Sequence, residues 1–159
     1  MNTKPLFRAG LVLGLGLGGL FDGIVFHQIL GWHHMICTTE SCQPNSIDEL
    51  KRQITQDGFF DFSVWSLTLI GVMLLFRAGR QPAQTWSGKV LFGAILAGWG
   101  TFNFVEGLID HQILGLHHVL PGHPQQFLFD MLYLASGLLL VAAGWAIARF
   151  ASPSRSGYG

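Results

Sequence analysis

Charged residues are scarce in this sequence, and their scarcity excludes several classes of protein. Only 11% of the 159 residues are Asp, Glu, Lys or Arg, and nine basic residues balance nine acidic ones. A chain with no net charge and no basic patch lacks the electrostatic attraction that nucleic-acid binding requires. The sequence also has no P-loop and no G-x-S-x-G nucleophile elbow. We therefore expect no nucleic-acid partner, no P-loop nucleotide hydrolysis and no hydrolase of the nucleophile-elbow type.

Apolar residues make up half of the chain and fall into four long runs, at residues 6–30, 59–76, 90–114 and 127–150. Each run is close to or above the roughly 18 to 20 residues with which a helix spans a bilayer. A signal peptide is the competing interpretation of the first run. That run is too long for a typical signal-peptide core and has no evident small-x-small cleavage site. We predict an all-α integral membrane protein with four transmembrane helices, in contact with the lipid bilayer.

Six of the seven histidines lie in a motif that occurs twice, as HQILGWHH at residues 27–34 and HQILGLHH at residues 111–118. Upstream, Asp22-Gly23 matches Glu106-Gly107 at the same distance. The sequence thus predicts one membrane domain, 1–159, with tandem two-helix repeats at 6–80 and 86–149. Because each repeat crosses the membrane twice, both copies have the same orientation, and we expect a four-helix bundle with a pseudo-twofold axis along the membrane normal.

Basic residues indicate the orientation in the membrane, because cytoplasmic loops carry an excess of Lys and Arg. Seven of the nine lie before the first helix, between the second and third helices, or at the end of the fourth. In these segments they are Lys4, Arg8, Arg77, Arg80, Lys89, Arg149 and Arg155. This pattern predicts cytoplasmic termini, with both histidine motifs at the opposite face. In a bacterium the chain would lie in the inner membrane, with its motifs facing the periplasm.

The repeated motif places ionisable side chains at similar depths. Gly31 and Gly115 suit the left-handed position that ends a helix, so His27 and His111 should lie about one turn inside the outer helix ends. Phe60-Asp61-Phe62 matches Phe129-Asp130-Met131, which predicts two carboxylates in the first turns of the second and fourth helices. If the chain turns back at each glycine, either member of each following histidine pair could cap this layer from outside. Asp22 and Glu106 lie about 7 Å deeper, as inner ligands or a proton relay.

Imidazole and carboxylate groups form a ligand set that suits iron, copper, zinc, nickel or manganese. Carboxylates in apolar spans are costly and normally mark a functional site, and within the four runs Lys and Arg occur only near the ends. Two acids with several histidines within four helices are also the ligand inventory of a dinuclear carboxylate bundle. Helix capping by Asp61 and Asp130, and structural hydrogen bonding by Asp22 and Glu106, are the alternatives. The candidate metal ligands are Asp22, His27, His33, His34, Asp61, Glu106, His111, His117, His118 and Asp130.

The two cysteines, Cys37 and Cys42, lie in the first outer loop. We expect a disulfide there, because the predicted compartment is oxidising and the second repeat has no cysteine. Copper(I) binding together with Met35 is the alternative. Neither role would make the cysteines part of the duplicated site.

The sequence resembles the bacterial predicted membrane proteins of the family called domain of unknown function 2243. The resemblance rests on DGIVFHQILGWHHM at residues 22–35, FNFVEGLIDHQILGLHHV at 102–119, and the segments FDFSVW at 60–65 and FDMLYL at 129–134. Some members of that family look to be associated with cytochrome oxidase copper-assembly proteins. The resemblance therefore implies copper or respiratory-chain biology, with oxidase-assembly or respiratory-chain proteins as partners.

Three functions remain open at this point. The first is a membrane metalloprotein with an iron, copper or zinc site, acting as an oxidoreductase or in metal handling. The second is a haem protein with His27 and His111 as axial ligands, although the chain has no C-x-x-C-H motif for covalent attachment. The third is a metal-free proton-coupled channel, carrier or assembly partner, working as a homo-oligomer. The sequence identifies no catalytic residue, so enzymatic activity is an open question.

Overall fold

A computed structural model describes residues 2–82 and 85–151, and within these ranges the chain is helical, without strands. Arg155, one of the residues used to predict orientation, lies outside the described residues. Four candidate membrane spans are long and apolar enough to cross a bilayer, which confirms the predicted all-α membrane fold. The elements are α1 (Lys4–Asp22), the π-helical segment η1 (Gly23–Ile29), α2 (Ile47–Gly79), α3 (Gly88–Glu106), the π-helical segment η2 (Gly107–Ile113) and α4 (Gln126–Ala151).

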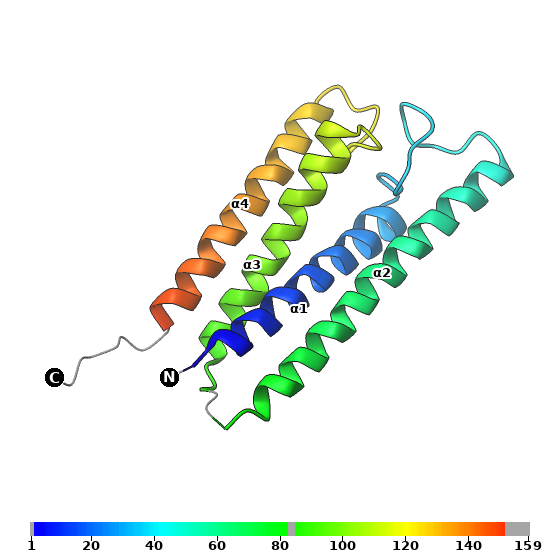
Figure 1. The fold of residues 1–159 in the computed structure, drawn as a ribbon. Helices are drawn as coiled ribbons and strands as arrows, with labels where there is room; N and C mark the ends of the chain where they lie inside the picture. The colour runs from blue at the N-terminus through cyan, green and yellow to red at the C-terminus, as the bar shows by residue number, and fades with distance from the viewer. Residues whose placement is uncertain (1, 83–84, 152–159) are drawn as a thin grey trace.

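The four helices form an open row rather than a closed bundle (Figure 1). The helices α1 and α3 contact each other at the centre, α2 packs against α1, and α4 packs against α3. The outer helices therefore lie on opposite sides of the central pair and expose large apolar side chains, such as Phe62 and Leu139. In a membrane these faces contact lipid, where an apolar surface costs nothing to expose. The predicted twofold axis stays a prediction.

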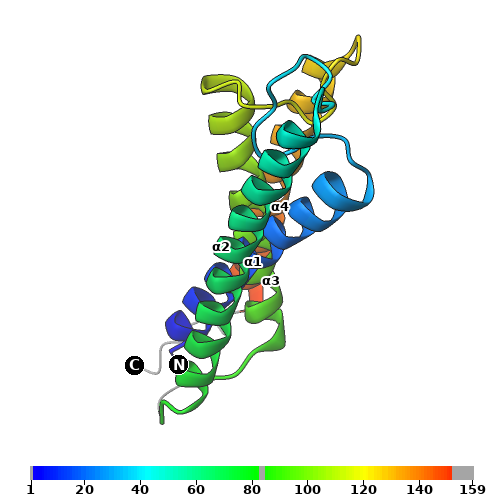
Figure 2. The same ribbon diagram turned by 90° about the vertical axis from the view of Figure 1, so that its right-hand side faces the viewer.

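Glycines allow the two central helices to approach closely. A Cβ atom on Gly14 would lie 2.1 Å from the carbonyl oxygen of Ile95, and one on Gly98 would lie 2.1 Å from the carbonyl oxygen of Leu11. Both positions therefore require glycine for the backbones to touch. In the side view of Figure 2, α1 and α3 cross and then diverge toward their outer ends. The divergence makes room for side chains between η1 and η2.

This crossing predicts opposite effects for two glycine-to-alanine substitutions. Gly98→Ala should lower the free energy of unfolding by about 1–3 kcal/mol, because its methyl group meets backbone atoms that cannot move aside. Gly58→Ala should raise it by up to about 1 kcal/mol, because Gly58 lies within α2 with no atom near the added methyl group. Thermal unfolding in detergent, followed by circular dichroism, measures both. Equal effects would contradict the close crossing.

The helix α2 begins at Ile47, twelve residues before the start of the predicted apolar run. Its first turn is capped, since the Ser46 hydroxyl accepts a hydrogen bond from the Glu49 backbone N–H and Glu49 accepts one from the Asn45 backbone N–H. Serine followed three residues later by glutamate is a known signal for the start of a helix. Asp61 therefore lies well inside α2, and its predicted place in the first turn is wrong. Asp130 likewise lies beyond the first turn of α4.

The outer loops of the two halves contact each other. Cys37 and Cys42 form a disulfide in the first loop. The backbone N–H of Cys37 donates a hydrogen bond to the carbonyl oxygen of Leu116, which lies in the second loop. The buried Gln53 side chain of α2 also donates a hydrogen bond to the Cys42 carbonyl oxygen. The loops thus form a connected cover over the outer ends of η1 and η2.

Candidate metal centre

The π-helical segments bring each buried acid onto the same face as a histidine. Asp22 and His27 are five residues apart, and so are Glu106 and His111. In an α-helix, residues five apart point about 140° away from each other. The wider π-helical turn, with its i to i+5 hydrogen bonds, stacks them instead. His27 Nε2 thus lies 3.2 Å from Asp22 Oδ2, and His111 Nε2 lies 3.1 Å from Glu106 Oε1.

The chain turns back immediately after each π-helical segment. Gly31 and Gly115 have left-handed backbone angles, with φ values of +57° and +58°. Each turn returns the first histidine of the following pair to the cluster, so His33 and His117 are 1% and 3% exposed. Their rings stack at 4.6 Å between centroids. His27 contacts His33 edge to face, and His111 contacts His117 in the same way, each at 4.8 Å.

Backbone carbonyls fix the tautomers of the two central histidines. Nδ1 of His33 lies 2.9 Å from the Val119 carbonyl oxygen, and Nδ1 of His117 lies 3.1 Å from that of Met35. A carbonyl can only accept, so each Nδ1 carries the hydrogen. Nε2 of His33 has no hydrogen-bond partner, whereas Nε2 of His117 lies 3.2 Å from Glu106 Oε1. Burial lowers the pKa of His33 well below its usual value, which favours this neutral form. Each half thereby anchors the Nδ1 of a histidine of the other half.

The outer pair of histidines, His27 and His111, lies between carboxylates. On its Nδ1 side, His27 is 3.2 Å from Asp57 Oδ1, and His111 is 3.4 Å from Asp130 Oδ1. A carboxylate on the Nδ1 side of a metal-binding histidine is the common arrangement in metal sites, because it orients the ring and leaves Nε2 for the metal. All four Nε2 atoms therefore turn toward the space that Asp22 and Glu106 share.

Asp57, rather than Asp61, is the counterpart of Asp130. Asp57 Oδ2 lies 2.6 Å from His34 Nδ1, and its other oxygen accepts a hydrogen bond from the Met35 backbone N–H. Asp130 makes the same two contacts with His118 Nδ1, at 2.6 Å, and with the Val119 backbone N–H. The alignment of Asp61 with Asp130 is therefore wrong by one helical turn. Asp61 instead accepts a hydrogen bond from the Gln28 side chain.

The second histidine of each consecutive His-His pair, His34 or His118, does not reach the central cluster. His34 and His118 contact the outer carboxylates through Nδ1, and their side chains are 16% and 34% exposed. They therefore hold Asp57 and Asp130 in place rather than contribute to the inner ligand set. The disulfide uses both cysteines, which leaves no thiolate for copper in this structure.

Six side chains form the inner set that could hold a metal, three from each half: Asp22, His27, His33, Glu106, His111 and His117. Donor atoms of His27, His33 and His117 lie within 4.8 Å of one another, as do those of Glu106, His111 and His117, and those of Asp22, His33 and Glu106. His33 Nε2 and Glu106 Oε2 are buried without a hydrogen-bond partner, and Asp22 Oδ2 and His27 Nε2 face each other at 3.2 Å without forming a hydrogen bond. In the described part of the chain, the basic groups paired with these two acids are histidines alone. Acceptors that face one another in this way fit a bound cation.

The two halves differ at one ring beside the cluster. Phe60 lies 5.4 Å from His27, whereas Tyr133 occupies the matching place 5.5 Å from His111. The Tyr133 hydroxyl is 3.5 Å from Asp22 Oδ1, so it can donate a weak hydrogen bond to that acid. Sequence reasoning missed Asp57 and Tyr133. The capping signal at Ser46 would have shown that Asp57 is helical, whereas no sequence signal identifies Tyr133.

Comparison with known proteins gives a family but no characterised relative. No curated protein and no solved structure matches the chain. A family described as predicted membrane protein (DUF2243) matches residues 9–151, which include all four helices from the second turn of α1 onward and both histidine motifs. The chain therefore belongs to this family of predicted membrane proteins, as its motifs indicated.

Proposed function

We propose that the chain is a membrane metalloprotein that binds one or two transition-metal ions between η1 and η2. The observation that carries this proposal is the convergence of four imidazoles on two buried carboxylates, with each Nδ1 directed to an anchoring oxygen. In the neutral form that metal ligation requires, four imidazoles together with two carboxylates carry a net charge of −2, which one divalent ion balances. The ligands are Asp22, His27, His33, Glu106, His111 and His117, with Asp57 and Asp130 as their supports.

The ring packing favours a metal ion over haem. His33 and His117 stack at the centre of the cluster, between His27 and His111. A porphyrin held by His27 and His111 would have to displace this stack. Iron, copper and zinc all suit the nitrogen and oxygen ligands, and iron or copper would supply redox chemistry when bound. We therefore propose a redox or metal-handling role, with an oxidoreductase as the enzymatic form.

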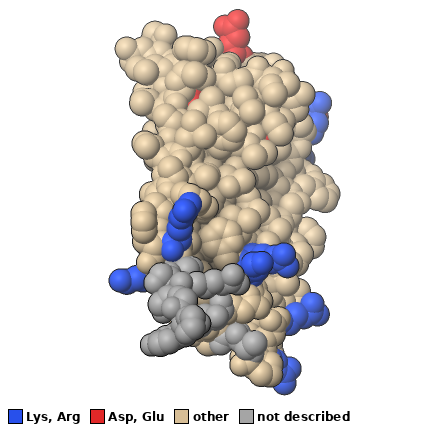
Figure 3. Space-filling model, turned by 60° about the vertical axis from the view of Figure 1, so that its left-hand side comes forward, with Lys and Arg blue, Asp and Glu red and all other residues tan. Residues whose placement is uncertain are grey.

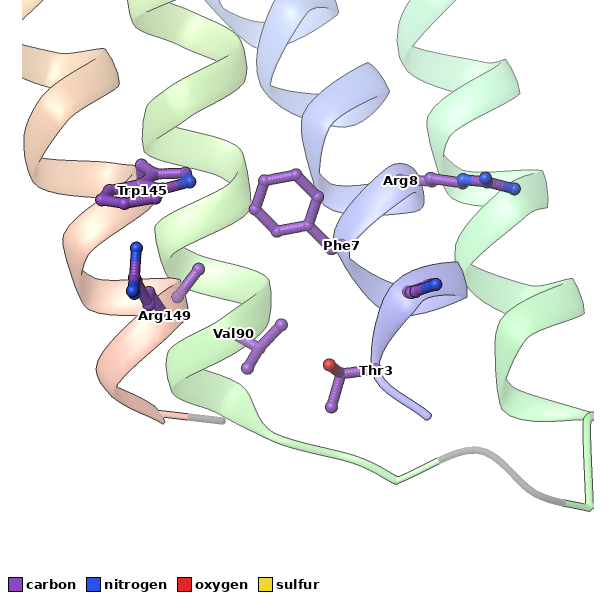
Figure 4. A pocket seen from close by; sticks show the side chains of 8 residues that line it. Thr3, Phe7, Arg8, Val90, Trp145 and Arg149 are labelled. Carbon is purple, nitrogen blue, oxygen red and sulfur yellow. The ribbon is translucent and has the colours of Figure 1, made fainter. Parts of the chain in front are cut away.

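The charge distribution supports an orientation with this site at the outer face of a bacterial inner membrane. Most Lys and Arg residues on the face in Figure 3 lie toward the end where α1 begins and α4 ends. A pocket at that end, of about 270 Å³, is lined by residues that include Lys4, Arg8 and Arg149. Arg149 lies over the Trp145 ring, while Arg8 points toward α2 (Figure 4). A cluster of basic residues suits a cytoplasmic interface, which supports the proposal that both termini lie in the cytoplasm.

Elemental analysis tests the proposed function. Protein purified in detergent, without added metal or a histidine tag, should contain one or two equivalents of iron, copper or zinc by plasma mass spectrometry. An absorption spectrum of the same sample reports haem through its Soret band. A sample that contains no metal and takes up none of these ions would overturn the proposal and assign the buried acids and histidines to proton movement. A Soret band would overturn it in favour of haem.

A further inference from the structure

A second pocket connects the cluster with the lipid-facing surface of the helix row. This lateral pocket, of about 270 Å³, is lined mainly by apolar side chains of α1, α2, α3 and η2. Val105 and Ile109 line it and are 45% and 40% exposed, so it opens on the surface that meets lipid. Glu106, a member of the inner set, also lines it. A molecule dissolved in the bilayer can therefore reach a proposed metal ligand from the side.

The pocket contains a carboxylate that has no partner. Asp110 lines the lateral pocket, and its side chain makes no hydrogen bond or ion pair with any residue in the ranges 2–82 and 85–151. It lies within a candidate membrane span, where an unpaired acid is costly and normally marks a ligand or ion pathway. The first half has Phe26 at the equivalent position, stacked on Trp32 with 5.4 Å between centroids. Only the second half thus offers an acid here.

The lining chemistry selects one class of ligand. Glu106 is only 7% exposed, and its Oε2 atom has no hydrogen-bond partner. Together with Asp110 it offers acceptors to hydroxyl groups. Phe60 and Phe102, with centroids 6.1 Å apart, present aromatic surfaces to a planar ring. An anionic amphiphile such as a fatty acid would be repelled by two carboxylates, whereas a neutral ring with hydroxyl groups would be held.

We propose that the lateral pocket binds a membrane-dissolved quinol, meaning a dihydroxylated aromatic ring with an apolar tail. The ring lies against Phe60 and Phe102, one hydroxyl donates to Asp110, and the tail extends past Val105 and Ile109 into lipid. Binding at this pocket stands on the pocket's own geometry. Glu106 belongs to both the pocket and the inner set, so the quinol could be a substrate of the metal centre. That role rests on the proposed function.

The test uses a decyl-substituted benzoquinol titrated into detergent-solubilised full-length protein by calorimetry, under oxygen-free conditions. Wild-type protein should bind the quinol at least about 10-fold more tightly than its dimethyl ether, which has the same ring and tail but no hydroxyl. Asp110→Asn should weaken quinol binding by about 10-fold. Asp110→Phe, which copies the residue at the equivalent position of the first half, should abolish it by filling the pocket. Decanoate should not bind.

Ile113→Phe provides the matched control, because Ile113 lies on the same segment, is 67% exposed and does not line the pocket. This variant should bind the quinol as the wild type does. Equal affinities for quinol and dimethyl ether, or undiminished binding by Asp110→Phe, would overturn the proposal. Metal content is measured on the same samples. Metal-loaded protein that does not bind the quinol overturns the pocket proposal alone. Protein that neither contains nor takes up metal, but binds the quinol in an Asp110-dependent way, overturns the proposed metal function and supports the pocket.

Discussion

Replacing His27 and His111 together with alanine is expected to lower the affinity for the bound transition metal by more than about 100-fold. Loss of a single partner outside the ligand shell already costs about 10- to 100-fold in metal sites, and this variant removes two proposed ligands. Each lost imidazole is 2–3% exposed, so water cannot easily replace it from outside. Metal content after equilibrium dialysis against a buffered series of free metal concentrations measures the change.

Two further variants keep this first prediction interpretable. His123→Ala should leave metal content unchanged, because His123 lies in the outer loop, 5.2 Å from the Phe129 ring, outside the inner set. His27→Phe with His111→Phe keeps an aromatic ring at each position but provides no lone pair, so it should lose metal while retaining helicity by circular dichroism. If these variants and His123→Ala lose equal amounts of metal, the repeated motif is not the metal site.

Much of the fold follows from the sequence because lipid imposes simple demands on the chain. A helix is the way in which an isolated segment satisfies its backbone in hydrocarbon, so four long apolar runs predict four helices. The same hydropathy does not predict the open row, since an apolar face can meet lipid or another helix equally well. Glycines distinguish the central pair: Gly14 and Gly98 permit the backbone contact that places α1 against α3.

The site was only partly predictable, and the reasons are local. Repetition of the motif identified the histidines and both inner acids, and the left-handed conformation of Gly31 and Gly115 was expected from their position. The π-helical segments were not expected, because no residue pattern separates a π-helical turn from an α-helical one. These segments matter for the site because Asp22 and His27, five residues apart, lie on the same face only in the wider π-helix.

The outer carboxylate of the first half was predicted at the wrong residue because a shared residue pattern does not determine contacts. Phe60-Asp61 and Phe129-Asp130 are the same dipeptide. In the structure, however, Phe60 corresponds to Tyr133, which lies one helical turn after Phe129. The longer first loop and the early start of α2 at Ile47 determine which acid faces His27. That choice depends on how α2 packs against α1, which the short Phe-Asp pattern does not determine.

Exchanging Asp57 for asparagine is therefore expected to lower metal affinity by about 10- to 100-fold, the usual effect of losing a carboxylate behind a metal-binding histidine. Asparagine is close to aspartate in shape, but it replaces the negative charge that faces His27 and His34 with an amide. Asp61→Asn should leave metal affinity unchanged, because Asp61 contacts Gln28 rather than a member of the inner set. Equilibrium dialysis against the same metal series compares the two variants.

The comparison is sharp because the two acids lie one turn apart on one helix, so general effects of charge removal from α2 are shared. Asp130→Asn, the counterpart in the second half, should behave like Asp57→Asn, since Asp130 makes the same contacts with His118 and His111. A loss of metal with Asp61→Asn but not with Asp57→Asn would show that Asp61, rather than Asp57, corresponds to Asp130. If only Asp57→Asn and Asp130→Asn lose metal, each half supports its histidine, His27 or His111, with the carboxylate that lies one turn before Phe60 or Tyr133.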